Sequence, residues 1–195
     1  MALPNVVSLL RIGCVPIVLI LMICPGVWPR RVAALVFLAA SISDFVDGWL
    51  ARRGGAMTPL GQFLDPLADK LLIAGVLIML VAEPPGSGVP AWVAVVIVLR
   101  ELAVTGLRGI ASQNGMALPA EELGKYKMLT QIFALQGLVL AERLPIPLTG
   151  IEIDFRAAGL RFLWVALILS VWSGIDYHIK VFRRLAREGI GRPVA

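Results

Sequence analysis

The sequence predicts an all-α integral membrane protein with six transmembrane helices, and three observations lead to this fold class. Hydrophobic residues make up 58% of the 195 residues and charged residues only 16%, and the mean hydropathy is +0.86. Soluble domains contain about 45–50% apolar and about 25% charged residues, so this chain has too few polar residues to cover a surface in water. The third observation is that its apolar residues fall into separate runs of the length that a membrane crossing needs.

The apolar runs number six, and punctuation of the kind found in Pro25-Gly26 and in the segment 83–86 separates them. They lie at about 12–28, 32–51, 66–82, 89–112, 126–142 and 157–177. Residues 2–11 either begin the first span or form an interfacial helix before it, and the sequence leaves both open. Six crossings of about 20 residues leave no room for a soluble domain, so we expect one transmembrane domain over residues 1–195.

The charges are unevenly distributed along the chain. Lys and Arg total 18 against 13 Asp and Glu, and the net charge is +5. In a membrane protein this excess is expected to face anionic headgroups or an anionic substrate, and we expect no nucleic-acid partner. Six crossings place 13 of the 18 basic residues with the termini and five on the opposite side, namely Arg30, Arg31, Arg143, Arg156 and Arg161. The positive-inside rule therefore predicts that both termini face the cytoplasm.

Four aspartates flank the connection between the second and third spans. Asp44 and Asp47 lie three residues apart near the end of one span, and Asp65 and Asp69 lie four apart at the start of the next. These spacings place each pair on one helix face, so two neighbouring helices can direct their carboxylates to one point. Clustered carboxylates repel one another unless a cation compensates them, and oxygen ligands without His or Cys suit Mg²⁺ or Mn²⁺. The sequence predicts a divalent-metal site at one membrane face.

Neighbouring residues on the same stripe fit a phosphate-bearing ligand. Gly48 and Ala51 lack bulk, so a ligand could approach the helix closely, and the guanidinium of Arg52 could meet a phosphate. One alternative is that the aspartates are helix caps and solvated charges. Another is a divalent-cation transporter, whose carboxylates should lie near the bilayer midplane instead of at the ends of their spans.

A second group of charges interrupts the fourth span. Arg100 and Glu101 lie at about its middle, where each charge costs roughly 2.5–3.5 kcal/mol on insertion scales, so they are expected to face the interior and to be functional. Arg108 shares a helix face with Arg100, and Lys125 and Lys127 begin the fifth span. Together these cations could bind a phosphate on the acceptor. The alternative is a buried Arg–Glu pair that only fixes helix packing, with lysines that reach the membrane surface.

The run from Asp44 to Asp69 resembles the signature of the CDP-alcohol phosphotransferase family. The matching positions are Asp44, Asp47, Gly48, Ala51, Arg52, Gly61, Asp65 and Asp69. The resemblance implies a six-helix transmembrane bundle, a homodimer and a two-metal site that transfers a substituted phosphoryl group from a CDP-alcohol to a hydroxyl and releases CMP. It implies that all four aspartates bind metal, that Asp69 is also the general base, and that Gly48, Ala51, Arg52 and Gly61 hold the CDP moiety.

Four further segments are similar to bacterial members of this family that use sn-glycerol 3-phosphate as acceptor. They are residues 3–11, 64–70, 100–108 and 124–127. The similarity implies CDP-diacylglycerol as donor, phosphatidylglycerol phosphate as product, two Mg²⁺ or Mn²⁺ ions per site, and a location in the bacterial cytoplasmic membrane among membrane lipids. Inositol phosphate, serine and phosphatidylglycerol remain open as acceptors, because the aspartate signature is common to the whole family.

Overall fold

The computed structural model describes residues 3–54, 59–83, 87–113, 122–145 and 152–188. In this part of the chain, six helices and two short strands follow one another. They are α1 Leu3–Ile23, α2 Val27–Gly54, α3 Pro59–Ala82, α4 Ala91–Gln113, α5 Glu122–Leu140, β1 Arg143–Pro145, β2 Glu152–Asp154 and α6 Phe155–Glu188. Each predicted apolar run lies within or largely overlaps one helix, so the prediction of six helices is confirmed. The first helix is continuous from Leu3, and whether its first residues lie in the span or at the membrane interface stays open.

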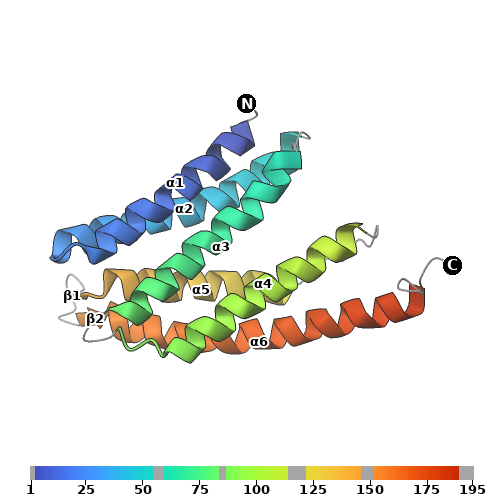
Figure 1. Ribbon diagram of the computed structural model, residues 1–195. Coiled ribbons are helices and arrows are strands. Elements are labelled where there is room, and N and C mark those ends of the chain that lie inside the picture. Colours follow the sequence, from blue (N-terminus) through green and yellow to red (C-terminus); the bar gives the residue numbers. More distant parts are fainter. Residues whose placement is uncertain (1–2, 55–58, 84–86, 114–121, 146–151, 189–195) are drawn as a thin grey trace.

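The helices run alternately up and down, so α1 begins and α6 ends at the same end of the bundle (Figure 1). The end of α2 and the start of α3, which carry the four signature aspartates, lie at that end as well. We call it the aspartate end. The opposite end holds β1 and β2, which pair antiparallel with Arg143 opposite Asp154. We call it the strand end.

Apolar side chains from all six helices form the core. Phe37, Leu77, Leu135 and Leu163 are at most 2% exposed. At 25 cal/mol per Å² of apolar surface, fully burying one such side chain stabilises the fold by about 1.5–3 kcal/mol relative to water. In a membrane, however, burial against neighbouring helices replaces contact with lipid, so close packing between helices carries more of the stability.

Helices α5 and α6 approach each other closely where they cross, and two glycines face each other there. A Cβ on Gly137 would lie 2.7 Å from the carbonyl oxygen of Phe155 and 3.1 Å from Cα of Gly159. A Cβ on Gly159 would lie 2.8 Å from the carbonyl oxygen of Ala134. No larger side chain fits at either position without moving a backbone, so glycine is what allows these two helices to touch.

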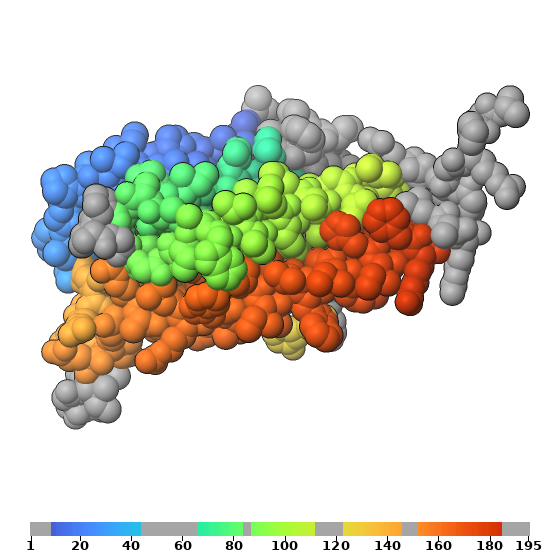
Figure 2. All heavy atoms as spheres, turned by 60° about the horizontal axis from the view of Figure 1, so that its bottom comes forward, coloured from blue at the N-terminus to red at the C-terminus, as the bar shows by residue number. Residues whose placement is uncertain are grey.

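The outer surface of the bundle is also apolar. α4 and α6 lie side by side along the face shown in Figure 2, and the rings of Trp92 and Trp164 join them with centroids 5.6 Å apart. Ile168 and Trp172 on α6 are 65% and 67% exposed. Large contiguous apolar surfaces of this kind are covered by lipid or by another protein.

Among the described residues, one helix is long and apolar enough to cross a membrane, Phe155–Arg184, and Leu9–Ile23 forms a shorter apolar helix. α4 illustrates why the other helices are less apolar, because it carries Arg100, Glu101 and Arg108. Six transmembrane helices therefore remain a prediction, whereas the helical architecture is established.

The sequence did not predict how the chain enters α6. Asp154 ends β2, and its Oδ1 accepts a hydrogen bond of 2.9 Å from the backbone N–H of Ala157. This is an N-terminal helix cap, which supplies a partner for a backbone donor that the helix itself leaves unpaired. That hydrogen bond, aided by a second from Arg143, lowers the pKa of the Asp154 carboxyl.

Candidate functional site

Most of the aspartate signature lies where the structure describes the backbone only. Helix α2 contains the positions of Asp44, Asp47, Gly48, Ala51 and Arg52, and α3 contains those of Gly61, Asp65 and Asp69. Both segments are helical, as the spacing argument required. Apart from that of Asp69, these side chains lie outside the described residues, so their convergence on a metal remains a prediction.

The donor set itself fits a hard divalent cation. All four predicted ligands are carboxylates, and they are carried by two helix ends that meet at the aspartate end (Figure 1). Within the side chains that the structure describes, no group of three His, Cys, Asp or Glu residues could hold a metal ion. The predicted site uses the carboxylates of Asp44, Asp47 and Asp65 together with Asp69.

Arg11 is a feature of this region that the sequence analysis counted only as a basic residue on the cytoplasmic side. It lies on α1 and is 2% exposed. Its Nη2 donates a hydrogen bond of 3.3 Å to Oγ of Ser43, the residue before Asp44. A buried cation is thus held against the helix that carries the first pair of aspartates, where it would reduce the repulsion between carboxylates. The signal in the sequence was a single charge within an apolar run.

Asp69 lines a small cavity between α3, α4 and α5. The cavity measures about 20 Å³, and its walls are Asp69, Lys70, Ile73, Glu101, Lys127, Met128 and Gln131. The structure therefore brings together Asp69, predicted as general base, and Lys127, predicted as an acceptor ligand, from helices α3 and α5. Gln131 was not predicted from the sequence, whereas Glu101 was expected to face the interior, and both line the same space.

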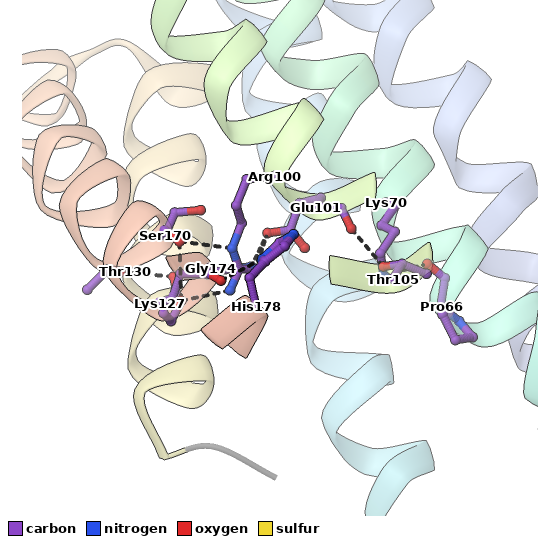
Figure 3. A network of polar contacts seen from close by, with 11 residues as sticks. Pro66, Lys70, Arg100, Glu101, Thr105, Lys127, Thr130, Ser170, Gly174 and His178 are labelled. Atoms are coloured by element: carbon purple, nitrogen blue, oxygen red, sulfur yellow. Dashed lines mark hydrogen bonds and ion pairs between the residues drawn. The ribbon is translucent and has the colours of Figure 1, made fainter. Parts of the chain in front are cut away.

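Glu101 is the centre of an ion-pair network beside this cavity (Figure 3). Its Oε1 accepts a hydrogen bond of 3.0 Å from Nη1 of Arg100 and another from Nζ of Lys127. The side chains of Arg100, Glu101 and Lys127 are 13%, 16% and 9% exposed. One carboxylate thus pairs with two cations in a place where an unpaired charge would cost several kcal/mol.

Arg100 connects this network to α6. Its Nε donates to the backbone carbonyl of Ser170 at 2.9 Å, and its Nη2 donates to Oγ of Ser173 at 2.7 Å. A Cβ on Gly174 would lie 3.0 Å from Cγ of Arg100, so the absence of a side chain there leaves room for the arginine. The guanidinium that was predicted to bind an acceptor phosphate therefore already has protein partners on three of its nitrogens.

The two remaining predicted acceptor ligands lie closer to solvent. Arg108 is exposed on α4, and its guanidinium carbon lies 5.7 Å from the centre of the Tyr177 ring. Lys125 is exposed near the start of α5. Both positions are near the helix ends at the aspartate end, where a phosphate could reach them from water.

Comparison with known proteins identifies the family. Residues 1–172 match the family model of the CDP-alcohol phosphatidyltransferases. The chain is 40% identical to the CDP-diacylglycerol–glycerol-3-phosphate 3-phosphatidyltransferase of Bacillus subtilis, over 94% of this chain and 96% of that protein. It is 35% identical to the protein of the same name from Rickettsia bellii, over 90% of this chain and 92% of that protein.

A plant protein is similar as well. The chain is 32% identical to a cardiolipin synthase (CMP-forming) of Oryza sativa subsp. japonica, over 96% of this chain and 59% of that protein. These names describe the relatives. The family model covers most of the chain, including both segments that carry the aspartates. The chain therefore belongs to the CDP-alcohol phosphatidyltransferase family, as the aspartate signature predicted.

Proposed function

We propose that this chain is a membrane enzyme that transfers the phosphatidyl group from CDP-diacylglycerol to sn-glycerol 3-phosphate, giving phosphatidylglycerol phosphate and CMP. The observation that carries this proposal is the 40% identity, over nearly the whole chain, to a relative named for this reaction. The family assignment favours phosphatidyl transfer over cation transport, because the carboxylates then have a role in group transfer.

The proposed active site lies at the aspartate end. Asp44, Asp47, Asp65 and Asp69 would hold two divalent cations, Mg²⁺ or Mn²⁺, and Gly48, Ala51, Arg52 and Gly61 would hold the CDP moiety. The bound cations would offset the negative charge of the pyrophosphate and of the leaving CMP. The all-carboxylate donor set and the dependence of this family on divalent metals support this assignment.

Asp69 would act on the acceptor. Its carboxylate would accept the proton of the 1-hydroxyl of glycerol 3-phosphate while that oxygen forms a bond to the β-phosphorus of CDP-diacylglycerol and the bond to CMP breaks. The position of Asp69 in a cavity that also contains Lys127 supports this role. Arg108, Lys125, Lys127 and Arg100 are proposed to attract and hold the acceptor phosphate, and the exposed Arg108 and Lys125 are the two whose side chains reach water.

The site is proposed to face the cytoplasm. All six helices would cross the bacterial cytoplasmic membrane, with both termini on the cytoplasmic side, and two copies would form a homodimer. The excess of basic residues at the aspartate end and the apolar exposed face of α6 support this arrangement. The donor could then enter sideways from the inner leaflet with its acyl chains among the lipids.

The test is CMP release by purified protein in detergent with CDP-diacylglycerol and Mg²⁺. Glycerol 3-phosphate, inositol 1-phosphate, serine and phosphatidylglycerol would be compared as acceptors. We expect turnover with glycerol 3-phosphate only, and loss of that turnover when EDTA removes the metal. Turnover with a different acceptor would retain the aspartate site and overturn the acceptor assignment.

A second candidate is cardiolipin synthesis with phosphatidylglycerol as acceptor. The similarity to the cardiolipin synthase of Oryza sativa favours it. Phosphatidylglycerol carries no terminal phosphate monoester, so this reaction would not need the exposed cations Arg108 and Lys125. The four-acceptor assay distinguishes the two functions directly.

A further inference from the structure

Gln131 lines the cavity beside Asp69, and the proposed reaction gives its side chain no role. It lies on α5 and is 2% exposed. Its Nε2 is buried, and no atom in the described part of the chain accepts a hydrogen bond from it. Leaving a buried amide donor without a partner costs about 1–3 kcal/mol, so a native structure that keeps one usually supplies a water or a ligand to it.

The cavity that Gln131 lines is small, and four of its lining residues carry ionisable side chains. At about 20 Å³ the cavity holds one group of the size of a water molecule, and Gln131, Asp69, Glu101 and Lys127 line it. Gln131 and Lys127 lie four residues apart and share one face of α5. A single bound oxygen would therefore be within reach of donors from α5 and of carboxylates from α3 and α4.

The charge balance of the cavity favours a neutral group. Two carboxylates, Asp69 and Glu101, and two ammonium groups, Lys70 and Lys127, line it. Lys127 already donates to Glu101. A phosphate oxygen can only accept hydrogen bonds and would meet two carboxylates, whereas a hydroxyl can accept from Gln131 and donate to a carboxylate.

We propose that Gln131 is a specificity-determining residue whose side-chain amide binds the 2-hydroxyl of glycerol 3-phosphate. This inference depends on the proposed function. In that reaction Asp69 takes the proton of the 1-hydroxyl, and the exposed cations take the phosphate on carbon 3. The 2-hydroxyl is the polar group that remains, it is neutral, and it is of the size that the cavity accepts.

The probe for this contact is 3-hydroxypropyl phosphate, which keeps the attacking hydroxyl and the phosphate but lacks the 2-hydroxyl. Its kcat/KM would be compared with that of glycerol 3-phosphate by CMP release in detergent with CDP-diacylglycerol and Mg²⁺. We expect the wild-type protein to prefer glycerol 3-phosphate by at least about 10-fold, because the analogue leaves the amide unpaired. Equal use of the two acceptors by the wild-type protein would overturn the proposal without any variant.

Two variants locate the preference at Gln131. Gln131→Met keeps the length of the side chain and removes both donors, and Gln131→Glu replaces them with an acceptor. Each should reduce the preference for glycerol 3-phosphate by about 10- to 100-fold, mainly by slowing the reaction with glycerol 3-phosphate. Gln136→Met is the matched control, since Gln136 is a half-buried glutamine of the same helix that does not line the cavity.

The outcomes separate the failure of this inference from that of the proposed function. If kcat/KM falls equally for both acceptors in folded Gln131 variants, the wild-type preference is kept. Gln131 would then support the fold or contact the attacking hydroxyl, and the assignment would be overturned. A change of the preference in Gln136→Met would overturn it as well. Absence of turnover with glycerol 3-phosphate in the wild-type protein would instead refute the proposed function.

Discussion

The two ends of the bundle use their charges differently. At the strand end each of three arginines pairs with its own carboxylate: Arg30 with Glu83, Arg31 with Glu142, and Arg143 with Asp154. Arg31 and Glu142 form a forked pair, with Nε–Oε1 at 3.0 Å and Nη2–Oε2 at 2.8 Å. At the aspartate end Glu101 is shared by two cations, and the network surrounds a cavity.

We interpret this as a difference between charges that stabilise the fold and charges that are proposed to bind a ligand. In a forked ion pair the hydrogen-bonding groups of both side chains are occupied, so a third group gains little by binding to either side chain. A carboxylate shared between Arg100 and Lys127, beside a buried amide without a protein partner, leaves hydrogen-bonding capacity unused. Substitutions at the aspartate end should therefore change kinetics, and substitutions at the strand end should change stability.

The largest effect is expected for Asp69→Asn. The amide cannot accept the proton of the acceptor hydroxyl, so kcat should fall by about 10²- to 10⁴-fold while the protein still binds CDP-diacylglycerol. CMP release measures the first quantity and donor binding to purified protein the second. Asp176→Asn, an aspartate of α6 paired with Lys180, is the control and should retain kcat. Near-normal turnover of Asp69→Asn would refute its role as base.

A smaller and more selective effect is expected for Arg108→Ala. Only the acceptor carries the phosphate that Arg108 is proposed to hold, so the KM for glycerol 3-phosphate should rise by about 10- to 100-fold and that for CDP-diacylglycerol should not. Steady-state kinetics with each substrate varied in turn gives both constants. Arg183→Ala, at an exposed arginine of α6, should leave both unchanged. Equal increases for the two substrates would contradict the assignment.

At the strand end, Glu83→Gln should affect stability alone. The substitution breaks the forked pair with Arg30, whose Nη2 lies 2.7 Å from Oε2 of Glu83, and the two side chains are 19% and 23% exposed. The free energy of unfolding should fall by about 1–3 kcal/mol, with kcat unchanged. Thermal unfolding in detergent and CMP release test the two parts. A large loss of kcat in folded protein would show that this end also contributes to the reaction.

The smallest effect is expected at the cap of α6. The N–H of Ala157 lowers the pKa of the Asp154 carboxyl from its ordinary 3.8, so Asp154 stabilises the folded protein above the pKa of the unfolded chain. This contribution is lost as the pH falls through the lowered pKa. Asp154→Ala should thus lower Tm by a few degrees at pH 7, and the difference from wild type should shrink below about pH 4. A difference that does not depend on pH would mean that the charge is not involved.

The sequence predicted the helices well, because helices depend on local patterns, whereas the aspartate site remains a prediction. Apolar runs of sufficient length mark helices, and the aspartate spacing depends only on the helical period. The sequence did not predict which residues the charged side chains contact. Arg100 was predicted to face a phosphate, but the structure places Ser170 and Ser173 against it from α6, about 70 positions away in the chain.

Three other features were also beyond reach of the sequence. The burial of Gln131 and its unpaired amide depend on how α3 and α4 pack against α5. The contact of Arg11 with Ser43 depends on the packing of α1 against α2. The helix cap at Asp154 lies in the part of the sequence from residue 143 onward, where we found no motif or resemblance that would predict a role. Each of these depends on contacts between distant segments, which no periodicity in a single sequence encodes.

The glycine crossing of α5 and α6 is also a point about which α6 can tilt. The helices touch at Gly137 and Gly159, near the strand end, and Tyr177 lies 18 residues further along α6, about 27 Å away at 1.5 Å per residue. A tilt of about 5° at this pivot would therefore displace the ring beneath Arg108 by about 2 Å. A membrane helix accommodates a mismatch with the bilayer thickness partly by tilting. If α6 spans the membrane as proposed, a change of bilayer thickness would therefore move the ring that lies against Arg108, a proposed acceptor ligand.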